Sequence, residues 1–260
     1  MTGQMRIALL SLVPIITLMA CGTNANNGAG GDMQPAACVP HIVQCTDQSI
    51  QQLGLFDTPN LANLANSENT SPTGTTFTTK IDATGGGLSP SKSFVYAKFT
   101  ANGLARVDVS DETAFVSTDW DIAFRRFVIR TNSGVSGPGC VTVARTASAT
   151  TFDNLEFAPA GLMERSEEYF ADPSNACEYV PDGSGLGSPG VAMQSFWTYP
   201  GCVAMTDNVF VLTVAGGKKV KLVVDSYYTP SVQDVCDNTG ALPAGASGAG
   251  NVVVKWAFLP

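Results

Sequence analysis

The sequence predicts an all-β protein of antiparallel, sandwich-like strands, joined by long disulfide-stapled loops and containing little helix. Runs of β-branched and aromatic residues that alternate with polar ones recur from Ser93 to the carboxyl end. The 260-residue chain has 26 Gly and 15 Pro but only 14% charged residues, a composition typical of strands and turns. Cysteines spread along the chain are available to cross-link the loops.

The amino terminus has the pattern of an export signal. Arg6 precedes an apolar run over residues 7–20, which is too short to span a bilayer comfortably. The run ends in Leu-Met-Ala-Cys, which looks like a bacterial lipobox, so residues 1–20 are predicted to be a lipoprotein signal peptide and Cys21 to carry the lipid. Gly22 follows instead of an aspartate, which favours the outer membrane, at the cell surface or the periplasmic face. The alternative is an ordinary secretory signal with an incidental cysteine.

Three segments follow the signal. Residues 21–37 are small, polar and Gly-rich, which predicts a flexible tether. Residues 38–92 contain two cysteines and only short apolar clusters between turn formers, so we expect an irregular segment with one or two brief helical turns. Residues 93–260 carry the strand signals and are predicted to form the β domain.

The cysteines that follow Cys21 are even in number, which predicts three disulfides in an exported chain. We expect Cys38 to pair with Cys45 in a small local loop. The other four would staple long loops: Cys140, Cys177, Cys202 and Cys236. Zinc is a competing use of cysteines, but the chain has no CxxC pair and only 1 His, which disfavours a structural zinc site.

The first strands of the domain are predicted around Asn102-Gly103. "FVYAKF" precedes this pair and "LARVDV" follows it, which indicates a hairpin. In the next run, "STDWDIAFRRFVIRTN" (117–132), the apolar alternation changes phase at Arg125-Arg126, which predicts a β-bulge in a strand between two packed layers. Trp120 is predicted to anchor the core.

The charges of that run allow two interpretations. Asp119 and Asp121 could lie on the same side of the strand as a catalytic carboxylate pair. The interpretation that we favour is ion pairing with nearby arginines: Arg125, Arg126 or Arg130.

The later elements follow in chain order. Residues 140–152 alternate as a strand, "GLMERSEEYF" (161–170) could form one short helix, and residues 172–202 form a long loop. A hairpin is predicted over residues 208–228, with a turn at Gly216-Gly217. Residues 251–260 are predicted to form a closing strand paired in the sheet.

Composition and motifs disfavour two classes of function. The net charge of −8 and the absence of a basic cluster give little support for nucleic-acid binding. Acyl-transfer catalysis usually needs a histidine base, and the lone histidine, His41, is expected at the surface beside the tether. The chain has no GxSxG, HExxH, phosphate-binding or EF-hand pattern, so we expect no enzyme activity.

Three motifs together resemble one family. "WDIAFRRFVIRTNSG" (120–134), "NVFVLTVAGGKKVKLVVDSYY" (208–228) and "GNVVVKWAFLP" (250–260) are similar to the HmuY-like haem-binding lipoproteins, over about residues 93–260. The resemblance implies an all-β HmuY-type domain on a cell-surface lipid anchor. It also implies capture of haem and its delivery to an outer-membrane haem transporter.

The resemblance implies two axial haem ligands, histidines in some members and methionines in others, between the first motif and the last hairpin. No histidine lies there, so methionine is the candidate ligand. Met163, Met193 and Met205 lie in this region, and we prefer Met193 and Met205. The alternative role for each is a gap-filling apolar residue.

Two other functions stay open. The scaffold could serve as a surface structural or interaction lipoprotein that does not bind haem, which would suit the missing histidines and the added cysteines. It could also bind another apolar or aromatic molecule in a pocket formed by loops, with Phe196, Trp197 and Tyr199 as walls.

Overall fold

The computed structural model of the protein describes residues 38–71, 74–85, 90–246 and 248–260. The predicted signal peptide (1–20), the predicted lipidation site Cys21 and the predicted tether (21–37) lie outside the described residues. No helix of the described ranges is long and apolar enough to cross a membrane.

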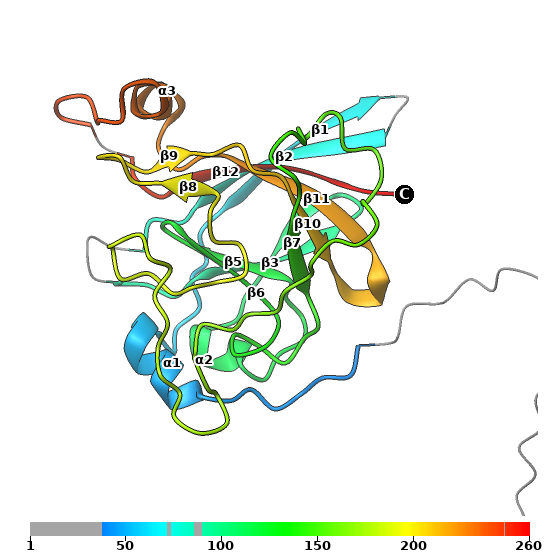
Figure 1. Ribbon diagram of the computed structural model, residues 1–260, viewed down its shortest axis with the longest axis vertical. Coiled ribbons are helices and arrows are strands. Elements are labelled where there is room, and N and C mark those ends of the chain that lie inside the picture. The colour runs from blue at the N-terminus through cyan, green and yellow to red at the C-terminus, as the bar shows by residue number, and fades with distance from the viewer. Residues whose placement is uncertain (1–37, 72–73, 86–89, 247) are drawn as a thin grey trace, which may run out of the picture. The chain divides into compact units, whose positions relative to one another are not determined.

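The described strands form two larger antiparallel sheets and one short ribbon (Figure 1). The six-stranded sheet has the order β1 (Leu64–Ser71), β2 (Gly74–Asp82), β12 (Asn251–Phe258), β11 (Lys219–Ser226), β10 (Phe210–Thr213) and β7 (Thr142–Arg145). The four-stranded sheet has the order β4 (Gly103–Val107), β3 (Val95–Thr100), β5 (Ile122–Arg125) and β6 (Val128–Thr131). The ribbon pairs β8 (Trp197–Thr198) with β9 (Ala204–Met205).

Helix is confined to short elements. These are α1 (Thr46–Leu53), α2 (Asp111–Ala114), α3 (Pro230–Thr239) and a single 3₁₀ turn, η1 (Ala215–Gly217). The all-β, antiparallel fold class with little helix is therefore confirmed.

A shared apolar core joins the two larger sheets. Trp256 of β12 is fully buried, stacks on Phe77 of β2 at 4.6 Å between ring centroids, and meets Phe99 of β3 edge-on at 5.0 Å. Because Phe99 belongs to the four-stranded sheet and the other two rings to the six-stranded sheet, these contacts hold the layers face to face. The sandwich-like packing follows from this core.

Residues 38–92 are more regular than the sequence suggested. Besides α1, they form the β1–β2 hairpin, and β2 pairs with β12 in the middle of the six-stranded sheet. Strand β2 buries Phe77, Thr79 and Ile81 on one face, while β1 is exposed along most of its length. The expectation of an irregular segment was wrong here, because a threonine-rich strand and a solvated edge strand carry little apolar alternation.

The predicted hairpin at Asn102-Gly103 is confirmed as β3–β4. The predicted β-bulge at Arg125-Arg126 is wrong, because the chain reverses there. Arg125 pairs with Val128 across a two-residue turn in which Arg126 has φ 53°, so β5 and β6 are antiparallel neighbours. The apparent change of phase in the sequence is this turn.

The carboxyl-terminal elements match the prediction. Strands β10 and β11 form the expected hairpin, and β12 is the closing strand, paired with β11 and β2.

The helix expected over residues 161–170 is absent from this described stretch: Arg165 bridges Val143, and Phe170 bridges Tyr179. An extended chain lets Glu167 and Tyr169 both enter the interior, where they are fully buried.

The three disulfides are confirmed, but the preferred local pair is wrong. Cys38 bonds Cys140, Cys45 bonds Cys177, and Cys202 bonds Cys236. Cys45 is buried directly before α1 and bonds Cys177, which lies in the chain between β7 and β8. Cys38 is exposed, as is its partner Cys140. The first two bridges tie the segment before β1 to the β domain, and the third ties the turn between β8 and β9 to α3.

Candidate functional site

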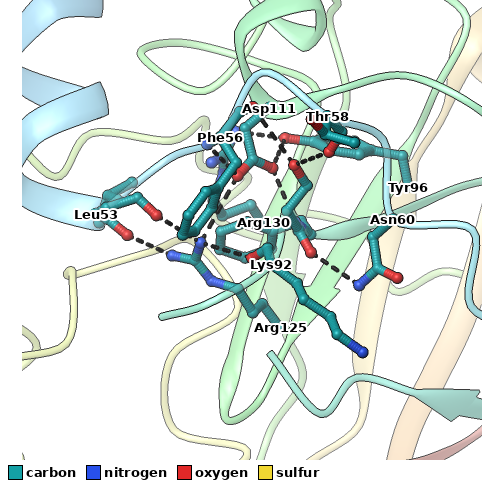
Figure 2. Close-up of polar contacts among 12 residues, drawn as sticks. Leu53, Phe56, Thr58, Asn60, Lys92, Tyr96, Asp111, Arg125 and Arg130 are labelled. Atoms are coloured by element: carbon teal, nitrogen blue, oxygen red, sulfur yellow. Dashed lines mark hydrogen bonds and ion pairs between the residues drawn. The ribbon is translucent and has the colours of Figure 1, made fainter. Parts of the chain in front are cut away.

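Arg125 and Arg130 of the β5–β6 hairpin belong to a buried polar cluster that joins this hairpin to the segment before β1 (Figure 2). Arg125 donates hydrogen bonds to the carbonyl oxygens of Leu53, Gly54 (2.9 Å) and Lys92 (3.3 Å). Its Nη1 lies 3.6 Å from Oδ2 of Asp111. Burial lowers the pKa of Arg125 to about 10, although Asp111 opposes that shift, so the guanidinium remains charged at neutral pH.

Asp111, the first residue of α2, collects donors from several elements. Its carboxylate accepts from the backbone N–H groups of Phe56 and Phe94 and from the hydroxyl of Tyr96. Burial raises the pKa of Tyr96 well above its usual value, which keeps this hydroxyl a donor. Asp111 and Arg125 are thus paired inside the protein, which is the arrangement of a structural clamp, whereas Nε and Nη1 of Arg130 in the same cluster have no hydrogen-bond partner among the described residues.

The expected ion pairs of Asp119 and Asp121 with the arginines are wrong. Asp119 is exposed, and Asp121 accepts from the N–H of Phe99 at 2.9 Å on the neighbouring strand. Alternation along the strand could not identify Asp111 as the partner, because α2 reaches Arg125 only through the fold. The prediction for Trp120 is confirmed: it is 1% exposed, and its Nε1–H donates to the carbonyl of Ala114.

The second feature is a surface cavity of about 390 Å³ beside the β8–β9 ribbon. Three stretches of chain and the end of β7 surround it. The lining residues are Arg145, Asp182, Gly183, Ser184, Gln194, Ser195, Trp197, Thr198, Tyr199, Thr206 and Asn208.

Aromatic rings and one cation give this cavity its character. Trp197 packs on Phe127 at 5.2 Å between ring centroids, and this contact holds its indole in place. Tyr199 is 48% exposed at the rim. Arg145 is exposed, and within the described residues no ion pair occupies its guanidinium. The cavity therefore offers a flat apolar wall and an available positive charge.

The backbone on both sides of the cavity is unusual. Ser195 has φ 72° and Asp207 has φ 55°, in the left-handed region that residues other than glycine seldom adopt. The carbonyl of Ser195 accepts from Oγ1 of Thr206 (2.8 Å) and Nδ2 of Asn208 (2.6 Å), which holds the two segments together. Strained residues of this kind often mark ligand sites.

The predicted ligand residues flank this cavity in the sequence without lining it. Met193 immediately precedes Gln194 and is fully buried in the main apolar core. Met205 pairs with Trp197 across the ribbon, is half-buried, and immediately precedes Thr206. Met163, which the sequence analysis set aside, is 86% exposed.

The other residues singled out from the sequence fall in different places. Trp197 and Tyr199 line the cavity, as expected of walls, whereas Phe196 is buried behind it. His41 is exposed, and its Nε2 lies 2.9 Å from the carbonyl oxygen of Gly134.

Sequence reasoning missed Arg145 and Glu167. Arg145 is the last residue of β7 and carries no local motif. Glu167 lies within a run that reads as a helix, yet its buried carboxylate contacts the segment of Met193. In the part of the chain that the structure describes, no three His, Cys, Asp or Glu side chains gather as a metal site.

The chain is an antiparallel two-sheet β protein with a surface cavity beside the β8–β9 ribbon. The family described as HmuY protein matches residues 90–236, more than half of the chain. This protein belongs to the HmuY family, a family of binding proteins.

Solved structures give more distant similarities. A protein of Bacteroides vulgatus described as a candidate HmuY-like haem-binding protein is 18% identical, with 70% of this chain and 90% of that chain covered and a TM-score of 0.42. The apo HmuY analog of Tannerella forsythia is 16% identical, with 79% and 100% covered and a TM-score of 0.36. Apo PinO of Porphyromonas is 14% identical, with 76% and 98% covered and a TM-score of 0.37. No curated protein matches the chain.

Proposed function

We propose that this protein is a lipid-anchored haem-binding protein that takes its ligand in the cavity beside the β8–β9 ribbon. The observation that carries the proposal is the position of this cavity. It lies where the segments that bear Met193 and Met205 meet, with Trp197 and Tyr199 as walls and Arg145 at its edge.

The two aromatic residues and the arginine of this otherwise polar lining support a flat ligand that bears carboxylates. Trp197 and Tyr199 can contact the face of a planar ring system. Arg145 can pair with a carboxylate such as a haem propionate, since guanidinium and carboxylate form charge-assisted hydrogen bonds. The volume of about 390 Å³ falls in the range of small-molecule pockets.

The axial ligands proposed are the thioether sulfurs of Met193 and Met205. Met205 is half-buried at the ribbon, whereas Met193 is 0% exposed, so its segment must turn outward for its sulfur to reach iron. Thioether is a soft ligand, which favours the reduced iron. The strained Ser195, two residues beyond Met193, is a natural point for that rearrangement.

The proposed cellular setting follows from the amino terminus. Acylation of Cys21 would anchor the protein in the outer membrane, and the tether over residues 21–37 would hold the β domain away from the lipid. An outer-membrane haem transporter is the proposed partner that receives the ligand.

A surface interaction lipoprotein without haem is the second candidate. The complete burial of Met193 favours it, because a methionine packed in the core also serves as an apolar filler.

Titration of the purified protein with ferric and ferrous haem tests the proposal. We expect a saturable, sharpened Soret band, with tighter binding of the ferrous form. Met193→Ala and Met205→Ala should each weaken binding, whereas the exposed Met163→Ala should not. A spectrum of free haem in both redox states, with the disulfides intact, would favour the interaction protein.

Arg145→Gln tests the carboxylate contact separately. The variant should bind haem less tightly but should bind the haem dimethyl ester as the wild type does, because the ester has no carboxylate to lose. An equal loss for both ligands would contradict the proposed role of Arg145.

A further inference from the structure

We infer that Glu167, in the chain between β7 and β8, is a positioning residue that sets the place of the Met193 segment by hydrogen bonding both to that segment and to β6 of the four-stranded sheet. The inference deepens the haem-binding proposal and rests on it, since it names what holds one of the two proposed ligand segments.

Glu167 bridges β6 and the segment before Met193. One carboxylate oxygen, Oε1, accepts from the backbone N–H of Thr131 at 2.8 Å and from its hydroxyl at 2.9 Å. The other, Oε2, accepts from the backbone N–H of Ala192 at 2.8 Å. Glu167 is 0% exposed, so water does not compete for these bonds.

The loop that follows β6 fixes the backbone of Glu167. Its N–H donates to Oγ of Ser133 (3.2 Å), and its carbonyl accepts from the N–H of Val135 (3.0 Å). Gly134, with φ 54°, lies so close that an added Cβ would overlap the carbonyl of Glu167. The "RTNSG" part of the first motif therefore forms the seat of this glutamate, which gives these polar residues a role beyond the strand itself.

The Met193 segment packs in the main apolar core through Ala192 and Met193, and its backbone is joined to the β6 side by the bond from Ala192 to Glu167. It is a turn in which the N–H of Gln194 donates to the carbonyl of Val191, and it leads into the left-handed Ser195. The bond from Ala192 to Glu167 fixes this turn directly before Met193. A change at this bond should therefore move the proposed ligand without disturbing the strands.

The Glu167 carboxyl group accepts hydrogen bonds from both Thr131 and Ala192. Burial raises the pKa of Glu167, while its bonds from Ala192 and Thr131 and the charge of Arg130 oppose that rise. Three donors on two oxygens require an acceptor at both positions, which an amide cannot supply.

Glu167→Gln therefore distinguishes the bond to Thr131 from the bond to Ala192, because the variant cannot keep both. The new amide can accept at one oxygen only, and its NH₂ must face an N–H donor. Because Thr131 is held in the β5–β6 ladder and Ala192 lies in a loop, the loop should yield. The matched control is Thr131→Val, which removes one hydrogen bond from the same carboxylate but leaves the bond to Ala192 intact.

Hydrogen exchange on the ligand-free protein, resolved to single amides, tests the positioning role. We expect exchange at Ala192 and Met193 to rise about tenfold or more in Glu167→Gln and to stay at the wild-type rate in Thr131→Val, because only the first orphans the buried donor of the loop. Equal rates in the two variants, or loss of protection at Thr131 with Ala192 unchanged, would overturn the inference.

If Glu167→Gln does not fold, Glu167→Asp gives the same test, since a shorter carboxylate cannot span both partners. Haem affinity is the second readout. It should rise about tenfold in Glu167→Gln, because the bond that holds Met193 in the core opposes the outward turn that would bring its sulfur to iron, and it should not change in Glu164→Gln, a surface change of the same charge. Unchanged affinity in Glu167→Gln would also overturn the inference. Absence of haem binding in the wild type would instead contradict the proposed function, while the exchange rates still report on Glu167.

Discussion

Arg125 and Asp111 form a buried ion pair, with 3.6 Å between Nη1 and Oδ2, that fastens the β5–β6 hairpin to α2. Arg125 is 7% exposed and Asp111 0%, so both charges are withdrawn from water and depend on each other and on backbone partners. The pair explains why charged residues occur inside an apolar strand run. These two side chains hold α2 and the β5–β6 hairpin together.

Breaking this pair should be costly. Arg125→Met should lower the free energy of unfolding by about 3–5 kcal/mol, because it leaves the Asp111 carboxylate buried without its cation. Urea denaturation of the purified protein measures the change. Arg106→Met is the control, since Arg106 pairs with Asp108 at the surface and should change stability far less. Equal effects of the two substitutions would contradict the clamp.

The disulfide pattern and the predicted lipidation of Cys21 together predict that the denatured, unreduced mature protein has no free thiol. Peptide mapping should recover Cys38–Cys140, Cys45–Cys177 and Cys202–Cys236. Replacing Cys45 and Cys177 together by alanine should cost about 2–5 kcal/mol of unfolding free energy, because the bridge closes a long loop. Two or more free thiols per chain, or a Cys38–Cys45 peptide, would show that the pairing is wrong.

Asp121 makes stability depend on pH in a defined direction. Burial raises its pKa above the ordinary value of 3.8, although the bond from Phe99 opposes the rise. Ionisation of Asp121 is therefore harder in the folded protein, so its contribution favours folding at low pH and weakens as pH rises through the folded pKa.

Asp121→Asn removes this titration and keeps an acceptor for Phe99. The unfolding free energy of the wild type should thus rise relative to that of the variant as pH falls toward 3.8. Parallel denaturation series over this range measure the difference, in which groups common to both proteins cancel. A difference that is constant with pH would rule out the raised pKa.

Cys21→Ala should move the protein from the membrane to the soluble fraction. Each buried CH₂ of an acyl chain contributes about 0.8 kcal/mol, so loss of the chains removes the proposed anchor. Partitioning between detergent and aqueous phases gives the readout. Retention of the variant in the detergent phase would mean that something other than Cys21 holds the protein at the membrane.

Strand pairs with apolar alternation could be predicted from the sequence, and others could not. The β3–β4 and β10–β11 hairpins have a glycine-containing turn between apolar runs, so local pattern suffices. Strand β2 escaped prediction because threonine fills positions that valine would mark, and β1 because it is exposed. Amino-acid pattern reports burial, and both strands owe their place to pairing with β12 and each other.

The candidate site was less predictable than the fold. Trp197 and Met205 could be proposed from an apolar stretch and a resemblance, but Arg145 reaches the cavity, and Glu167 reaches the backbone before Met193, from other parts of the chain. The predicted Cys38–Cys45 pairing was wrong for the same reason, because Cys38 bonds Cys140, which lies 102 residues away in sequence. Long-range partners of this kind are set by the packing of the sheets and leave no local signal.

The most direct test of haem binding at the β8–β9 ribbon is anomalous diffraction at the iron edge from crystals of the protein grown with haem. The account predicts one iron peak between the sulfurs of Met193 and Met205, with the ring against Trp197 and a propionate at Arg145. Iron at His41 or elsewhere on the surface, or a filled cavity in which Met193 remains packed in the core, would contradict it.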